Sequence, residues 1–116
     1  MNLLNGLAIR PENHNLLNED FCQVIETLLP ELVASNNTMP RSIDPAAAVR
    51  NQGDFHGLLN ELGVDPSLHY ATMRINGLTS TFDYEADVLM IYVPSTTDLN
   101  RYYSSWVQSL NKLVSA

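Results

Sequence analysis

The chain has 116 residues, of which 45% are hydrophobic and 16% charged, and its formal net charge is −7. This length predicts a single domain over residues 1–116, long enough to bury a core of its own. The six basic residues are scattered along the chain, which argues against nucleic-acid binding and against attraction to an anionic membrane, because both require clustered Lys and Arg.

The N-terminal residues 1–12 are expected to precede the first helix as a segment that is either flexible or ordered. Their apolar run is preceded by no positive charge and ends at Arg10-Pro11, which fits neither a signal peptide nor a membrane span. We therefore expect a cytoplasmic protein, or a part of a complex assembled inside the cell, with no membrane partner.

A first helix is predicted from residues 13–15 to residues 36–37, with apolar side chains recurring at helical spacing. Pro30 interrupts this pattern, so the helix either kinks there or stops at Leu29 and restarts with Pro30 in its first turn. Cys22 lies within the pattern and is interpreted as a small buried hydrophobe. It is the single cysteine, so no internal disulfide is expected.

Cap signals predict a second helical region after a loop at Met39-Pro40. Asp44-Pro45 combines a capping residue with proline at the first helical position. Gly53-Asp54 marks a break or a second start, and residues 55–62 carry a compact apolar stripe. Gly63 is the expected stop, because glycine often follows the last helical residue.

The stretch from His69 to Val93 predicts three β-strands in a row. Asn76-Gly77 is a strong signal for a two-residue hairpin, and a second turn at 85–87 leads into the apolar run 88–93, interpreted as a buried strand. The hairpin register gathers apolar residues on one face, which is what fixes a register. It pairs Ile75 with Leu78, Met73 with Ser80, Ala71 with Phe82 and His69 with Tyr84.

A last helix follows Pro94, with Ser95 and Asp98 at capping-box spacing. Its apolar arc is wider than packing on one small sheet needs, and it holds three aromatic rings of the kinds enriched at binding hot spots. We expect part of this arc to bind another protein chain, with Tyr102 facing outward. The predicted interface residues are Leu99, Tyr102, Tyr103, Trp106, Leu110 and Leu113.

No catalytic, metal or cofactor motif is found in the sequence. The acidic turn at residues 83–87 lacks the glycine and the further oxygen ligands of a calcium loop. Two alternatives to an interaction protein remain: a small-ligand site between sheet and helices, and a small enzyme whose site is assembled from dispersed residues. The candidate group for the enzyme is Asp54, His56 and Glu61.

The stretch from Leu58 to Leu113 resembles part of a small acidic type III secretion chaperone, in which a helix, a strand meander and another helix recur. The resemblance implies a protein that works by binding another protein. The sparse charge and the single lysine, Lys112, fit a surface that is meant to be covered.

These observations predict an α+β fold with helices packed on a three-stranded antiparallel β-meander, in the order α-α-β-β-β-α. The predicted function is that of a non-enzymatic interaction protein without cofactors. It would be an adaptor, a chaperone-like protein or an assembly subunit, for example of a phage particle or a secretion apparatus. Its partner would be another protein, a further copy of the chain, or both.

Overall fold

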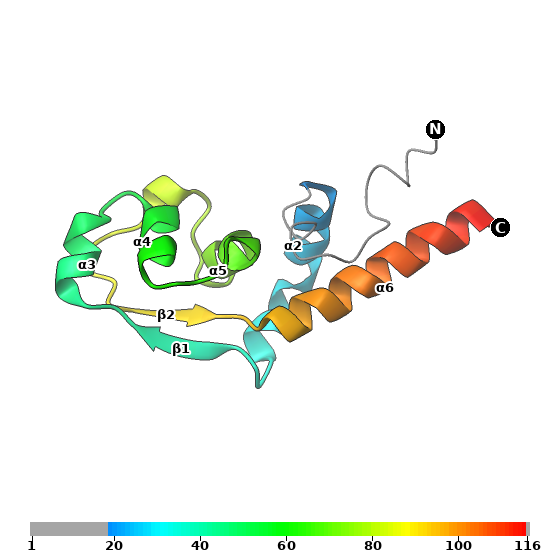
Figure 1. Ribbon diagram of the computed structural model, residues 1–116, viewed down its shortest axis with the longest axis horizontal. Coiled ribbons are helices and arrows are strands. Elements are labelled where there is room, and N and C mark those ends of the chain that lie inside the picture. The colour runs from blue at the N-terminus through cyan, green and yellow to red at the C-terminus, as the bar shows by residue number, and fades with distance from the viewer. Residues whose placement is uncertain (1–18, 116) are drawn as a thin grey trace.

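The computed structural model describes the backbone of residues 19–115 and the side chains of residues 20–112. The fold is α+β, as predicted, but its sheet has two strands, so the three-stranded meander is not found. Helices α3, α4 and α5 lie along one side of the sheet, and α2 and α6 lie at its end (Figure 1). In chain order the elements are α2 (Glu19–Ala34), β1 (Met39–Ser42), α3 (Pro45–Arg50), α4 (Phe55–Glu61), η2 (Pro66–Leu68), α5 (His69–Ile75), η3 (Thr81–Asp83), β2 (Met90–Val93) and α6 (Thr96–Ser115).

The sheet joins two segments that are distant in the sequence. β1 and β2 are antiparallel, with a register from Met39 opposite Val93 to Ser42 opposite Met90. β2 confirms a strand over the last four of the six predicted residues. Within β2 the buried side chain is Ile91, and residues 88–90 are exposed, so the interpretation of 88–93 as a buried strand is wrong. Met39-Pro40 was expected to lie in a loop, and that prediction is wrong because both residues belong to β1. Proline is tolerated on an edge strand where its nitrogen faces away from the partner.

A side chain covers the β2 edge of this small sheet, and a proline weakens its β1 edge. The side chain of Asn76 donates from Nδ2 to the Tyr92 carbonyl at 2.8 Å and accepts the Tyr92 N–H at 2.9 Å, as a neighbouring strand would. Because Tyr92 faces Asn76, its cross-strand partner Pro40 turns its nitrogen to the free edge of β1, where a donor is missing. A third strand therefore finds few free partners on either side.

Helix α5 replaces the predicted first strand, so the hairpin and its register are wrong. Asn76 is the C-cap of α5, and Gly77 follows with φ of 81°. The Gly77 N–H donates to the Arg74 carbonyl and the Leu78 N–H to the Met73 carbonyl, which closes the helix in a Schellman motif. Asn-Gly was misread because a type I′ turn and a helix end both need glycine at positive φ.

The predicted second strand, residues 78–84, is a turn followed by η3. Ser80 caps η3, and the Asp83 carboxylate accepts the Ser80 N–H, so two side chains expected on opposite faces of a strand make a capping box instead. The order α-α-β-β-β-α is therefore wrong. The segment between β1 and β2 is helical.

The predicted helices before residue 64 are largely confirmed. α3 begins at Pro45 after Asp44, and α4 begins at Phe55 after Asp54 and is followed by Gly63 with φ of 77°. α2 continues through Pro30, so the option that the helix stops at Leu29 is wrong. Its predicted start lies outside the described residues.

The core gathers buried side chains from all of the main helices and from β2. Phe21 of α2 meets Tyr103 of α6 edge to face, with ring centroids 5.0 Å apart, and also contacts Trp106. These contacts fix α6 against α2. The other fully buried large side chains are Ile25, Leu32, Phe55, Leu58, Leu59, Thr72, Tyr84, Ile91 and Leu99.

Candidate functional site

The predicted interface residues of α6 divide into two groups. Leu99 and Tyr103 are 0% exposed and pack in the core, so they present no surface to a partner. Tyr102, Trp106 and Leu110 are half-buried and lie at the margin of the core. The side chain of Leu113 lies outside the described residues.

Asp98 attaches the start of α6 to the turn after α2. Its carboxylate is 2% exposed and accepts hydrogen bonds from the Ser35 hydroxyl at 2.5 Å and from Asn37 Nδ2 at 3.2 Å. The Asp98 N–H donates to Ser95 Oγ at 3.0 Å, which is half of the predicted capping box. In place of the second bond of the box, from the Ser95 N–H to the Asp98 carboxylate, that carboxylate binds Ser35 and Asn37.

An exposed apolar surface forms a groove at the junction of α2, α5 and β2. A cavity of about 330 Å³ is lined by Val33, Thr38, Ile75 and Tyr92. Met90, on the same face of β2 as Tyr92, extends this surface. We call these residues the apolar groove: Val33, Thr38, Ile75, Met90 and Tyr92.

The groove is exposed and carries no charge on its lining side chains. Val33 is 60% exposed, Met90 50% and Tyr92 46%. Large apolar side chains that gather at one exposed site indicate a binding surface more strongly than scattered ones do. The sequence pattern does not reveal the groove, because the meander predicted for residues 69–93 keeps Ile75 and Tyr92 apart from Val33.

His56 and His69 form the most distinctive polar pair. Their Nδ1 atoms are 3.3 Å apart, and their ring planes lie within 14° of each other with centroids 5.3 Å apart. This separation is too long for face-to-face contact, so the rings meet edge to edge with the two Nδ1 atoms pointing at each other. A metal ion needs two lone pairs that converge on a third point. The geometry therefore fits a hydrogen bond between the rings.

The candidate enzyme group is not assembled around His56. Asp54 accepts the Gly57 N–H at 2.9 Å as the cap of α4, and Glu61 binds Arg50 and Asn51. Each of the three predicted side chains thus has a separate partner. Across the described part of the chain, no group of three or more His, Cys, Asp or Glu side chains is placed to hold a metal ion.

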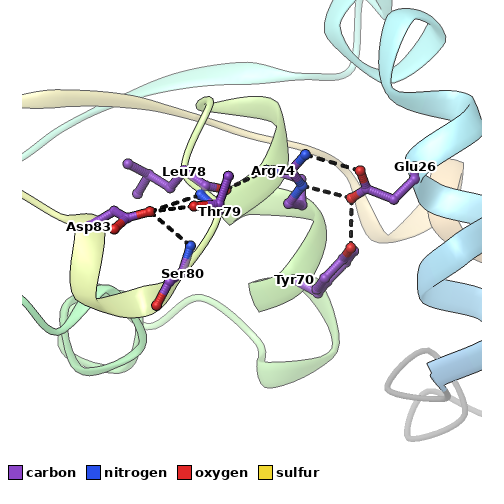
Figure 2. A network of polar contacts seen from close by, with 7 residues as sticks. All are labelled: Glu26, Tyr70, Arg74, Leu78, Thr79, Ser80 and Asp83. Carbon is purple, nitrogen blue, oxygen red and sulfur yellow. Dashed lines mark hydrogen bonds and ion pairs between the residues drawn. The ribbon is translucent and has the colours of Figure 1, made fainter.

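Two further polar networks stabilise the fold (Figure 2). Glu26 of α2 accepts from Arg74 at 2.7 and 3.0 Å and from the Tyr70 hydroxyl at 2.6 Å. The Arg74 guanidinium lowers the pKa of Glu26, whereas burial and the Glu26 carboxylate raise the pKa of Tyr70 to about 12. Asp83, from the predicted acidic turn, accepts from Thr79 and Ser80. The carboxylates of Glu26 and Asp83 thus accept hydrogen bonds from within the fold, which indicates a role in stability.

Comparison of the chain with protein-family models, with curated proteins and with solved structures finds no match. Among the helices that the structure describes, none combines the length and the apolar character needed to cross a membrane. The function of the chain is therefore inferred from the arrangement of its own residues.

Proposed function

We propose that the protein is a non-enzymatic interaction module, an adaptor, chaperone-like protein or assembly subunit that binds a protein partner or a further copy of itself. The observation that carries the proposal is the uncharged, exposed apolar groove on a chain of formal charge −7. A surface that only faces water is normally covered by polar and charged side chains, so a cluster of exposed apolar side chains indicates a binding site.

The dimensions of the groove fit the anchor of a protein interface. Its 330 Å³ cavity accommodates one large apolar or aromatic side chain, and interfaces draw most of their binding energy from a few such anchors seated in pockets. Tyr92 contributes an aromatic side of the pocket, and Met90 is an unbranched side chain that adapts to different partners. The half-buried residues of α6, Tyr102, Trp106 and Leu110, supply a second contact surface.

The test is photo-crosslinking from within the groove, combined with light scattering on the purified chain. A benzophenone amino acid at position 92 is expected to capture a partner, or a further copy if light scattering gives more than one chain per particle. Position 82 is the matched control, because Phe82 is 78% exposed on η3, apart from the groove (Figure 1). Equal crosslinking from both positions contradicts the proposal.

A second candidate is the binding of a small apolar ligand in the same cavity. Its volume lies near the lower end of the range for ligand pockets, about 300–1,000 Å³. Ligand-observed NMR with small aromatic and aliphatic probes tests this function. Binding that Tyr92→Ala abolishes, together with no crosslinked protein from position 92, favours it over the interaction module.

A further inference from the structure

We propose that His56 and His69 form an acid-sensitive latch between α4 and α5, which holds while at most one of the two rings is protonated and opens when both are. The proposal is independent of the apolar groove. It rests on the contacts of three ring nitrogens: His56 Nδ1, His69 Nδ1 and His69 Nε2.

The partners of His69 determine where its proton lies. His69 Nε2 is 3.0 Å from the Val64 carbonyl, which can only accept a hydrogen bond, so Nε2 carries the proton. Nδ1 of a neutral His69 is then an acceptor, and it faces His56 Nδ1 at 3.3 Å. His56 must therefore donate from Nδ1.

This pattern accommodates one additional proton and not a second one. His56 is exposed and can take up a proton on Nε2 while Nδ1 continues to donate to His69. A proton on Nδ1 of His69 would place two N–H groups against each other and two positive charges side by side. The hydrogen bond between the rings is then lost, and with it the polar contact between α4 and α5.

The surroundings of the pair do not neutralise a second charge. Asp65 is the acidic group that acts on His69 from η2, but its carboxylate accepts the Ser67 N–H at 2.9 Å. On α4, Asp54 caps the helix at the Gly57 N–H. Within the described residues, no carboxylate is hydrogen-bonded to either ring.

The remaining elements packed against α4 supply no free charge either. From η3, the Thr81 hydroxyl accepts the His56 N–H at 3.0 Å, and Asp83 is held by Thr79 and Ser80. From α3, Arg50 is paired with Glu61 of α4. Protonation of His69 is therefore opposed by burial, since the residue is 7% exposed, and by His56.

The latch holds an element on which two other contacts depend. α5 carries Tyr70 and Arg74, which bind Glu26 of α2, and it ends at Ile75, which lines the apolar groove. Burial lowers the pKa of His69 below its ordinary value of about 6.5. The stabilisation is therefore complete above that pH and decreases as the pH falls below it.

The test compares denaturant unfolding at pH 7.5 and pH 5.5 for three chains. Native carboxylates remain ionised over this range, so they contribute little to the difference. The wild-type folding constant is expected to fall by about twofold or more between the two pH values, because the unfolded chain then binds a proton that the buried His69 does not. His69→Gln, which retains a donor for Val64 and cannot be protonated, should show almost no fall.

His56→Asn is the matched variant for the exposed ring. It keeps a donor near the position of Nδ1 and removes one charge, so its fall should be smaller than that of the wild type. An equal fall in the wild type and His69→Gln overturns the latch.

Imidazole ¹⁵N NMR on the wild-type chain decides the question if a variant does not fold. The latch requires His69 to remain the neutral Nε2–H tautomer at pH 6, below the ordinary histidine pKa of about 6.5. Protonation of His69 at or above an ordinary histidine pKa rejects the proposal.

Discussion

Asp44 and Asp54 occupy the same position, immediately before the first turn of a helix, but their side chains have different environments. Asp54 accepts the Gly57 N–H, whereas the Asp44 side chain makes no capping hydrogen bond. Asp54→Ala is therefore expected to lower the free energy of unfolding by about 0.5–2 kcal/mol, and Asp44→Ala by much less. Chemical denaturation of the two variants measures the difference; equal losses would contradict this account of the caps.

Gly57 is the partner of that cap and gives a second prediction. A Cβ atom at this position would clash with the Asp54 carboxylate and would lie 2.9 Å from Asn51 Oδ1. Gly57→Ala should destabilise the protein although alanine is the better helix former by about 1 kcal/mol. In the Asp54→Ala background the same change should cost less, because the closer of the two clashes is gone, and a double-mutant cycle with thermal unfolding as the readout checks the difference.

At the scale of elements, the contact between α2 and α5 depends on the ionised form of Glu26. Because its pKa in the folded protein is lowered by Arg74, the stabilisation is present above about pH 4.5 and is lost as the pH falls through the lowered value. Glu26→Gln should flatten the decline in melting temperature between about pH 5 and pH 3. Glu31→Gln, on an exposed position of the same helix, should retain the wild-type slope.

Tyr70, the other partner of Glu26, predicts behaviour at alkaline pH. Its pKa is raised to about 12, so the folded state favours the neutral phenol. The stabilisation is present below the ordinary tyrosine pKa of about 10 and decreases as the pH rises towards 12. Tyr70→Phe should reduce the alkaline decline in a melting-temperature series. Part of the decline should remain, because burial also raises the pKa values of Tyr84 and Tyr103.

The element boundaries show what the sequence could predict. α3 and α4 follow from local signals, because Asp-Pro, the spacing of Phe55 and Leu58, and Gly63 all act within one or two turns. The prediction for residues 69–84 was wrong, because the seven residues of α5 are too few to separate a period of 2 from one of 3.6. Arg74 and Asn76 are held by long-range contacts with Glu26 and Tyr92, which local pattern does not contain.

For the whole molecule, substitutions at two neighbouring tyrosines distinguish an effect on association from an effect on folding stability. Tyr102 is half-buried, and Arg101 lies 5.1 Å from the centre of its ring, whereas Tyr103 is 0% exposed. If α6 contributes to an interface, Tyr102→Ala should weaken association by about 1–2 kcal/mol with little change in unfolding. Tyr103→Ala should instead cost about 3–5 kcal/mol of stability. Sedimentation and denaturation together measure both; unchanged association in Tyr102→Ala excludes that residue from the interface.

The candidate binding surface was less predictable than the fold class. The sequence analysis identified Tyr102, Trp106 and Leu110 from the width of an apolar arc. It did not identify the groove, whose lining comes from α2, α5 and β2 and exists only once β1 has paired with β2. A surface built from three separated segments has no periodicity along the chain.

The pairing of β1 with β2 also has a consequence for the time at which the protein folds. Their paired residues are roughly fifty positions apart, so closing the sheet carries the entropic cost of a long loop. During synthesis, β1 leaves the ribosome well before its partner exists, while α3, α4 and α5 already have their local contacts. The helices between the strands are therefore expected to form first, and the sheet, with the docking of α6, to complete the native state late.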